Sequence, residues 1–387
     1  MKSSEVVHLC IITSSYPLNP EDSRAAAGLF VQDFALAVHE LGHEVTVLTP
    51  DKRPGQKVSA PGISVEWFPW LGGAKTLSSM KPWQPLDAAS MASLFPAGIW
   101  ALERLHRERP IDRVLAMWAV PSGLLASWLK HRAGVPYDTW CLGSDIWTYG
   151  KLPGLRRAVA AVLRDSDRVF ADGLKLGRDA AALGGVEVDF LASSRRLPRP
   201  EVMPEEREGF AFVGRYAEVK GVDVLLRAMR RYLDAGGTQS LTLHGGGPEE
   251  ATLRSLIDEL RLGEHVTLGG FADEARVVEL FSSARCVVIP SRMESLPVVL
   301  SDAAQLGAPV IVTEVGDMGE LVSRHGAGRV VDAEDEAGLA EAMLEMERGD
   351  SADFEAGVAS LAAELSIETS ARSLAGQWSA KNKERAQ

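Results

Sequence analysis

Cysteine is scarce in this 387-residue chain, and its scarcity excludes two kinds of structure. The three cysteines, Cys10, Cys141 and Cys286, each lie inside an apolar run and have no spacing typical of a metal site. Three isolated cysteines also provide no disulfide framework, so we expect buried, reduced thiols. Long hydrophobic runs are missing too, because no segment approaches the roughly 18 apolar residues of a membrane-spanning helix.

Positive charge is also limited. The chain has 41 Lys and Arg residues against 53 Asp and Glu residues, which gives a formal net charge of −12. This balance argues against broad nucleic-acid binding, which needs a basic footprint, but it allows one local basic pocket. The early apolar stretch VVHLCIIT is too short for a signal peptide and lacks a small-residue cleavage site. We therefore expect a cytoplasmic protein.

Short strands rich in Val, Ile and Leu alternate with amphipathic helical stretches along the whole chain. The predicted strands of the first half are VVHLCIITS, HEVTVLTP, ISVEWF, RVLAMWA, YDTWCLG, RVFADG and VEVDFLA. Those of the second half are FAFVGR, LTLHGGG, HVTLGGF, CVVIPS, PVIVTE and GRVVDA. Apolar strands between helices are typical of a parallel sheet covered on both faces. The sequence therefore predicts an α/β protein with two doubly wound domains.

The segment 193–209, SSRRLPRPEVMPEEREG, interrupts this alternation. It is rich in proline and charge and has no periodicity, which is typical of a domain linker. We place the first domain at residues 1–198 and the second at residues 199–365. Ligands of doubly wound sheets bind beyond the carboxyl ends of the strands, so we expect a site in a cleft between the two domains.

Two loops of the second half suit an anionic ligand. In FVGRYAEVKGVDVLL, Arg215 ends a strand and Lys220 precedes a helix, where cations add to the N–H groups of the helix N-terminus. The alternative is a solvated basic loop. In LHGGGPEE, three glycines that include Gly246 allow a ligand to approach the backbone, and Pro248 is expected to begin the next helix. The dinucleotide motif G-x-G-x-x-G is not present.

A third loop begins the stretch SRMESLPVVLSDAAQLGAPVIVTEVG, residues 291–316. We expect Glu294 just before a short helix, Pro297 in its first turn, and Asp302 two turns in, roughly 12 Å from Glu294. A ligand with hydroxyl groups at both ends and a diphosphate in the middle, such as a nucleotide sugar, has this layout. The alternative is that Asp302 is a surface acid and that Glu294 only favours the helix dipole.

In order and spacing, these motifs resemble the retaining, nucleotide-sugar-dependent glycosyltransferases of the family-4 type (group 1), which have the GT-B fold of two Rossmann-like domains facing each other across a cleft. FVGRYAEVKGVDVLLRA, LHGGGPE, VTLGGF and PSRMESLPVVLSDAAQLGAPVIVTEVG carry the resemblance, and WAVPSGLLA and LGSDIW extend it more loosely into the first half. It implies a hexosyltransferase-like enzyme (EC 2.4) of polysaccharide or glycolipid biosynthesis. The implied substrates are a nucleoside-diphosphate sugar and the hydroxyl group of a carbohydrate or lipid-linked acceptor.

The resemblance also implies roles for individual residues. Arg215 and Lys220 hold the donor diphosphate, so neither a cofactor nor a metal is expected. Glu294 contacts the donor sugar, and Asp302 stands where the family has a Glu that binds the ribose. The other residues implied in donor binding are Gly28, where a helix start meets the diphosphate, and Gly246, Phe271, Ser295 and Leu296. The alternative for Gly28 is a plain glycine in a loop. The final helix, residues 366–387, is expected to pack back on the first domain.

The motif CLGSD departs from the family pattern. Asp145 is expected to touch the sugar or the acceptor as a catalytic residue, and turn capping is the alternative. Leu142 replaces the family's usual His, near the C6 end of the sugar. We therefore hypothesise a donor without a free 6-hydroxyl group, unless Leu142 faces the core.

Two other functions remain open at this point. Leu142 and Asp302 motivate a catalytically silent nucleotide-sugar-binding partner, and a nucleotide-sugar epimerase has the same fold, although we find no convincing set of acid and base residues for it. The stretch WFPWLGGAKTLSSMKPWQP combines Trp with Lys75 and Lys81. It indicates peripheral contact with the inner face of a membrane, stacking on sugar rings, or a hydrophobic cluster within a loop.

Overall fold

The computed structural model describes residues 6–17, 26–52, 57, 59–73, 75, 77, 80, 84–200 and 206–385. The chain divides into two compact units. The first unit comprises residues 1–193 and 367–387, and the second unit comprises residues 194–366. The predicted boundary between residues 198 and 199 and the observed division between residues 193 and 194 both lie in the segment 193–209.

A seven-stranded parallel sheet forms the centre of the first unit, in the order β3-β2-β1-β4-β5-β6-β7. The strands are β1 (His8–Ile12), β2 (Glu44–Pro50), β3 (Ile63–Phe68), β4 (Arg113–Met117), β5 (Tyr137–Cys141), β6 (Arg168–Ala171) and β7 (Asp189–Phe190). Each of them lies within one of the predicted apolar runs. The three central strands β1, β4 and β5 are buried along their whole length, as expected for a sheet with helices on both faces.

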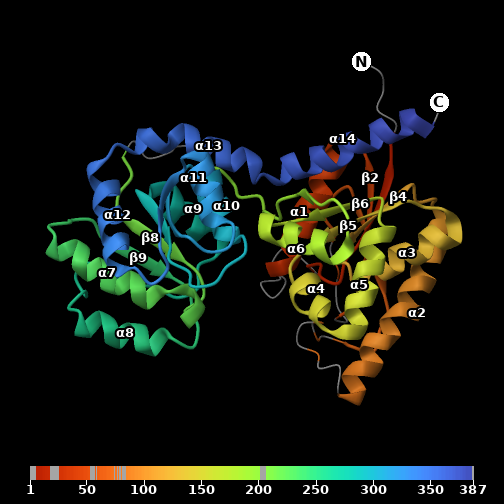
Figure 1. Ribbon diagram of the computed structural model, residues 1–387, viewed down its shortest axis with the longest axis horizontal. Coiled ribbons are helices and arrows are strands. Elements are labelled where there is room, and N and C mark those ends of the chain that lie inside the picture. Colours follow the sequence, from red (N-terminus) through yellow and green to blue (C-terminus); the bar gives the residue numbers. More distant parts are fainter. Residues whose placement is uncertain are drawn as a thin grey trace. The chain divides into compact units, whose positions relative to one another are not determined.

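Helices cover both faces of this sheet (Figure 1). Alternation along β1 places Cys10 and Ile12 in one core cluster and Leu9 and Ile11 in the other. The first cluster contains side chains of α2 (Pro85–Glu108), α3 (Ser122–Ala133), α5 (Pro153–Asp165) and α6 (Leu174–Gly184). The second contains side chains of α1 (Ala26–Glu40) and α14 (Ile367–Arg385). The last helix thus packs on α1 of the first unit.

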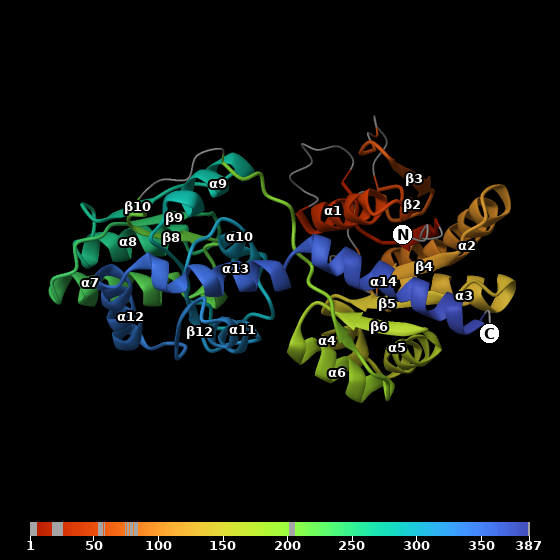
Figure 2. The ribbon, with the colours of Figure 1, turned by 90° about the horizontal axis from the view of Figure 1, so that it is seen from above.

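The second unit contains a six-stranded parallel sheet in the order β10-β9-β8-β11-β12-β13. Its strands are β8 (Phe210–Val213), β9 (Leu241–His244), β10 (Val266–Leu268), β11 (Cys286–Ile289), β12 (Val310–Thr313) and β13 (Gly328–Val331). The helices are α7 (Val222–Asp234), α8 (Glu250–Glu259), α9 (Glu274–Ser283), α10 (Val298–Gln305), α11 (Met318–His325), α12 (Glu336–Arg348) and α13 (Glu355–Glu364). Figure 2 shows α7 beside α12, with which it packs.

The topology of the second unit arranges the predicted loops in a row. Because all six strands are parallel, their carboxyl ends meet at one edge of the sheet. The loops after β10, β9, β8 and β11 follow one another along that edge, and they contain Phe271, Gly246, Arg215 with Lys220, and Glu294, respectively. Residues far apart in the sequence thus become neighbours.

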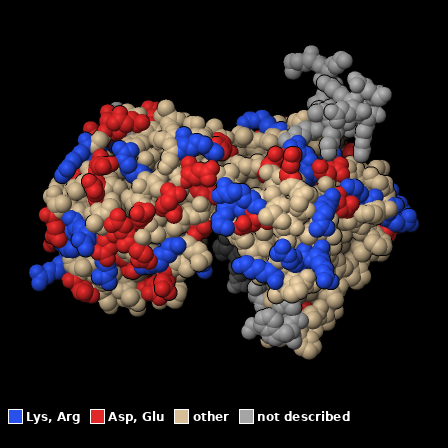
Figure 3. Space-filling model, in the orientation of Figure 1, with Lys and Arg blue, Asp and Glu red and all other residues tan. Residues whose placement is uncertain are grey.

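Three further properties bear on the sequence-based expectations. All three cysteines are buried and free, as predicted, and burial raises their pKa values. Among the described residues, no helix is long and apolar enough to span a membrane. On the face of the molecule in Figure 3, basic and acidic side chains are interspersed, and the described part of that face has no continuous basic surface.

Candidate active site

The loop after β8 presents one unpaired cation. Arg215 is exposed, and its guanidinium has no hydrogen bond or ion pair with any residue that the structure describes. The backbone N–H of Tyr216 donates to the carbonyl of Gly246 at 3.0 Å, which ties this loop to the glycine loop after β9. A free guanidinium next to glycine backbone is suited to bind an anion.

Lys220 and Glu294 form an ion pair. Lys220 ends a 3₁₀ turn (Glu218–Lys220) just before α7, and its ammonium group contacts Glu294 Oε2. The two side chains are only 21% and 18% exposed. The sequence predicted both residues for the site but not that they contact each other.

Each glycine of the loop after β9 has a different environment. A Cβ atom on Gly245 would lie 1.8 Å from the Gly214 carbonyl oxygen, and one on Gly247 would lie 2.3 Å from the Tyr216 carbonyl oxygen. Both glycines are therefore required by close backbone packing. A Cβ on Gly246 would meet no atom within 4 Å, so this residue faces open space. The next helix begins at Glu250, two residues after the predicted start at Pro248.

The start of α10 has unpaired polar groups. Within the described chain, no hydrogen bond is formed by the backbone N–H groups of Ser295 and Leu296. The buried Oγ of Ser295 also has no partner among the described residues. Unpaired buried groups are uncommon in folded proteins, and donors at a helix N-terminus bind anions. The helix begins at Val298 with Pro297 as its N-cap, so the placement of Pro297 in the first turn was wrong by one residue.

Asp302 differs most from expectation. It is the fifth of the eight residues of α10, only just past the first turn, and its side chain is 4% exposed, so the surface-acid alternative is wrong. Arg195, from the segment predicted to be only a linker, binds both of its carboxylate oxygens with donor–acceptor distances between 2.6 and 3.2 Å. Burial raises the pKa of Asp302, and the guanidinium of Arg195 opposes that rise.

Phe271 lies in the loop after β10 and is 83% exposed. The backbone N–H of Gly245 donates to the carbonyl of Gly270 at 3.0 Å, which fixes this loop beside the glycine loop. An exposed aromatic ring at a sheet edge beside these polar loops is available for stacking.

Comparisons with known proteins agree with this arrangement. Residues 193–356 match the family model described as glycosyl transferases group 1, and residues 26–192 match a glycosyl transferase 4-like domain. The chain belongs to the group 1, family-4-type glycosyltransferases. It is 25% identical over 350 residues to the putative teichuronic acid biosynthesis glycosyltransferase TuaC of Bacillus subtilis, covering 81% of this chain and 82% of TuaC. It is 25% identical over 366 residues to a D-inositol 3-phosphate glycosyltransferase of Catenulispora acidiphila, covering 84% and 83% of the two chains.

Solved structures establish the fold of this glycosyltransferase as GT-B. Sucrose-phosphate synthase from Thermosynechococcus elongatus superimposes with a TM-score of 0.70 at 17% identity, over 98% of this chain and 100% of that one. Anabaena HepE, whose structure is a complex with UDP, superimposes with a TM-score of 0.69 at 15% identity, over 97% and 100%. The predicted fold and enzyme class are thus confirmed, and the alternatives of a silent binding protein and an epimerase gain no support.

Gly28 of the glycosyltransferase lies in the first turn of α1, so the alternative of a plain loop glycine is wrong. A Cβ atom there would lie 3.0 Å from the Cα of Tyr16, which gives the glycine a packing role. Its predicted contact with the diphosphate stays a prediction.

Asp145 is fully buried, and its carboxylate accepts hydrogen bonds from the backbone N–H groups of Ala119, Leu142 and Ile146. Burial raises its pKa, and these N–H groups oppose the rise. The geometry favours turn capping over the predicted catalytic role, because the carboxylate has no exposed surface. Leu142 is half-buried and packs against the core of the first unit, which favours the core-facing explanation for this residue.

The predicted membrane or sugar-stacking segment is only partly described. Trp83 and Lys81 lie outside the described residues. Trp67 makes an edge-to-face contact with Tyr16, and Trp70 packs against the first unit's core. Lys75 is paired with Asp87 at 2.7 Å. The described part therefore fits the third alternative, a hydrophobic cluster, and membrane contact stays a prediction.

No group of three or more metal-ligating side chains is found in the described ranges. The sequence has one Asp-x-Asp pattern, Asp165 and Asp167 in the first unit. Both carboxylates contact the ammonium group of Lys130, at 3.6 and 3.0 Å. This pattern therefore has a structural explanation.

Proposed function

We propose that this glycosyltransferase transfers a sugar from a nucleoside-diphosphate donor to a hydroxyl group, with retention of the anomeric configuration. The main support is the set of unpaired or exchangeable charges and donors at the carboxyl edge of the second sheet. Among the residues that the structure describes, the Arg215 guanidinium has no partner and the Lys220 ammonium group is bound by Glu294 alone. In the same part of the chain, the N–H groups of Ser295 and Leu296 at the start of α10 are also unpaired.

A diphosphate between these groups would receive two cations and a helix N-terminus, which together stabilise the charge that develops on the leaving group. Lys220 would then move its contact from Glu294 to a phosphate oxygen. The released carboxylate of Glu294 would accept a hydrogen bond from a sugar hydroxyl group and fix the position of the reacting ring. We propose no metal for this step, because the charge is balanced by side chains and backbone N–H groups.

The nucleoside half of the donor would lie toward β9 and β10. We propose that Phe271 stacks on the base, that Gly246 allows close approach, and that Asp302 accepts from the ribose hydroxyl groups. A carboxylate bound by one guanidinium retains acceptor capacity for a further hydrogen bond. UDP in the HepE complex supports a nucleoside diphosphate as the ligand class.

We propose a carbohydrate or lipid-linked acceptor, and a role in polysaccharide biosynthesis. This proposal is supported by the names of relatives such as TuaC and the putative colanic acid biosynthesis glycosyltransferase WcaL of Escherichia coli, which is 31% identical over 170 residues, 42% of this chain and 41% of WcaL. Retention rests on the resemblance to the family-4 type.

Binding of UDP, GDP and ADP by calorimetry, with and without EDTA, tests this function. We expect at least one to bind, with an affinity that EDTA leaves unchanged. Arg215→Ala and Lys220→Ala should each weaken binding, since a hydrogen bond to a charged group contributes about 1.5–3 kcal/mol. Arg254→Met, which removes an exposed pair with Glu250 on α8, is the matched control and should bind normally. Unchanged affinity in both test variants would refute the site, and loss of binding with EDTA would refute metal independence.

The stereochemistry needs a separate measurement. Proton NMR of the first product formed from an α-linked donor should show an α-linked sugar, and a β-linked product would contradict retention.

A further inference from the structure

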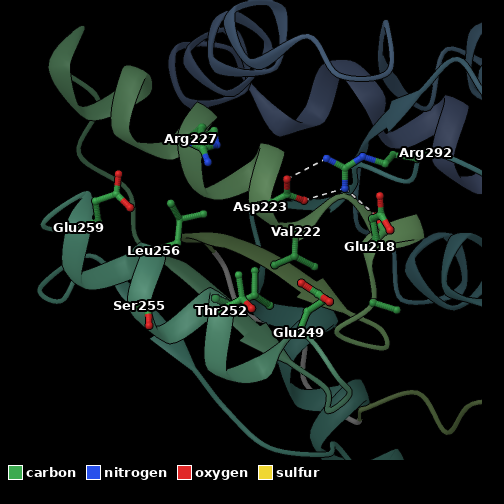
Figure 4. Close-up of a pocket in the computed structure, with 12 residues that line it drawn as sticks. Glu218, Val222, Asp223, Arg227, Glu249, Thr252, Ser255, Leu256, Glu259 and Arg292 are labelled. Atoms are coloured by element: carbon green, nitrogen blue, oxygen red, sulfur yellow. Dashed lines mark hydrogen bonds and ion pairs between the residues drawn. The ribbon is translucent and has the colours of Figure 1, made fainter.

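Arg292 lies near the proposed donor site, and its guanidinium forms polar contacts with Asp223, Glu218 and Glu334. Its guanidinium forms a bidentate interaction with the Asp223 carboxylate (Figure 4), with donor–acceptor distances of 2.7 and 2.8 Å. It also pairs with Glu334 and donates to the backbone carbonyl of Glu218 at 2.6 Å. Burial raises the pKa of Asp223, but the adjacent guanidinium outweighs this effect and holds the pKa below its usual value. We call these four residues the Arg292 clamp.

The clamp joins the two loops that carry the proposed catalytic charges. Glu218, in the loop after β8, and Asp223, in the first turn of α7, flank Lys220, and Arg292 precedes Glu294 by two residues in the loop after β11. The backbone connects the same loops, because the N–H of Arg292 donates to the carbonyl of Val219 at 2.9 Å. A Cβ on Gly221 would lie 2.0 Å from the carbonyl oxygen of Pro290, so the two loops are in close backbone contact.

Glu334 reaches the clamp from an unfavourable backbone conformation. Its φ angle is +66°, in the left-handed region that side chains other than glycine rarely adopt. Such conformations persist where surrounding contacts fix them, and they are frequent at functional sites. Within the described chain, the Glu334 side chain forms hydrogen bonds and ion pairs with Arg292 alone.

We propose that Arg292 is a positioning residue for sugar transfer, which sets the distance between Lys220 and Glu294 through the clamp. This inference rests on the function proposed above. Lys220 must leave Glu294 for the diphosphate while both remain within reach of the same donor. Fixing the two loops to each other keeps that exchange to a side-chain movement, which preserves the preorganised charges on which catalysis depends.

A double-mutant cycle tests the proposal through a readout that a purely structural role would not change. We expect Arg292→Met to weaken binding of the tightest of UDP, GDP and ADP by about tenfold, the change that corresponds to a contact of ordinary strength. In the Lys220→Ala background the same substitution should change affinity less than twofold, because the group it positions is gone. Arg292→Lys should bind the nucleotide more tightly than Arg292→Met but less tightly than the wild type, since an ammonium group cannot form bidentate interactions with Asp223 and Glu334.

Glu334→Gly keeps the test valid if Arg292→Met fails to fold. Glycine relieves the unfavourable φ, so the variant should be at least as stable as the wild type while its donor affinity and turnover fall. The matched control is Arg261→Gly. Arg261 also has a left-handed φ, +54°, and its side chain forms no hydrogen bond or ion pair with the described residues. Arg261→Gly should leave affinity and turnover unchanged.

The outcomes separate the two levels of the proposal. If Arg215→Ala and Lys220→Ala both bind nucleotides normally, the proposed function itself is wrong. If only Lys220→Ala does, Lys220 does not contact the nucleotide and the clamp proposal is refuted with that contact. If Lys220→Ala weakens binding but Arg292→Met and Glu334→Gly do not, only the clamp is refuted. Equal losses from Arg292→Met in the wild-type and Lys220→Ala backgrounds would also refute it, because they would show that Arg292 does not act through Lys220.

Discussion

At the scale of single residues, Asp302 is subject to opposing effects. Its burial disfavours the charged carboxylate, whereas the bound guanidinium of Arg195 favours it. Removing one partner of a buried pair leaves the other uncompensated, which costs about 3–5 kcal/mol for fully buried pairs. Arg195 is 23% exposed, so we expect a value toward the lower end of that range.

The Arg195→Gln variant should therefore lose stability in a pH-dependent way. A carboxyl group whose pKa is raised by folding contributes stability at low pH and loses it as the pH rises through the folded-state pKa. Without the guanidinium, the pKa of Asp302 rises further, because burial then acts almost alone and Glu274 adds a weak effect in the same direction. The free energy of unfolding, compared with wild type by urea denaturation, should be reduced more at pH 7 than at pH 5. Arg195→Gln combined with Asp302→Asn should abolish the difference between the two pH values, and an equal loss at both in the single variant would contradict the explanation.

The sequence could identify Asp302 but not its partner. The motifs placed Arg215, Lys220 and Glu294 at strand ends or helix starts and Asp302 farther along the helix that follows Glu294. The family resemblance then joined these four residues in one predicted site. The Arg195–Asp302 and Arg292–Asp223 pairs join residues 107 and 69 positions apart. Such contacts depend on the three-dimensional packing of loops, which neither the periodicity of the sequence nor the spacing of its motifs predicts.

At the scale of elements, the strands were predictable because a parallel sheet buries both faces of each strand. The short Val- and Ile-rich runs from β1 to β13 therefore differ from the amphipathic helices around them. Boundaries were less predictable, since the start of α10 depends on whether Pro297 adopts an extended or a helical conformation. It is extended here, with a ψ angle of 138°. The linker prediction was incomplete, because part of the segment binds α10 and the neighbouring helix ends.

The turn after β12 packs against the loop that contains Glu294, and Gly316 is in close backbone contact with that loop. This residue has φ of +60°, and a Cβ there would lie 2.4 Å from the carbonyl oxygens of both Glu294 and Ser295. Gly316→Ala should therefore displace that loop, lowering donor affinity as well as stability. The matched control, Gly326→Ala, has a similar φ of +68° but open space around the added methyl group.

Both substitutions should share the cost of a left-handed conformation, on the order of 1–3 kcal/mol. Only Gly316→Ala should also weaken binding of the nucleoside diphosphate in calorimetry. Equal affinity in the two variants would show that the position of the Glu294 loop does not control donor binding.

At the scale of the whole molecule, tryptophan is confined to one unit. The nine tryptophans lie at positions 67, 70, 83, 100, 118, 128, 140, 147 and 378. All of these positions belong to the first unit, since α14 contributes Trp378 to it, and residues 194–366 contain none. The charged and N–H groups proposed to bind the diphosphate, Arg215, Lys220 and the start of α10, all belong to the second unit. Tryptophan fluorescence therefore reports on the first unit alone, whereas far-UV circular dichroism reports on the helices and strands of both units.

We predict that a nucleoside diphosphate stabilises the second unit selectively. A ligand at about 100 times its Kd adds roughly 2.7 kcal/mol to the state that binds it. The circular dichroism transition should gain a component at higher temperature, whereas the midpoint of the tryptophan fluorescence transition should stay where it is without ligand. In Lys220→Ala the circular dichroism component should no longer shift at the same ligand concentration. Parallel shifts of both signals in the wild type would mean that the two units unfold as one cooperative block, because stabilisation from a site without tryptophan would then have reached every tryptophan in the chain.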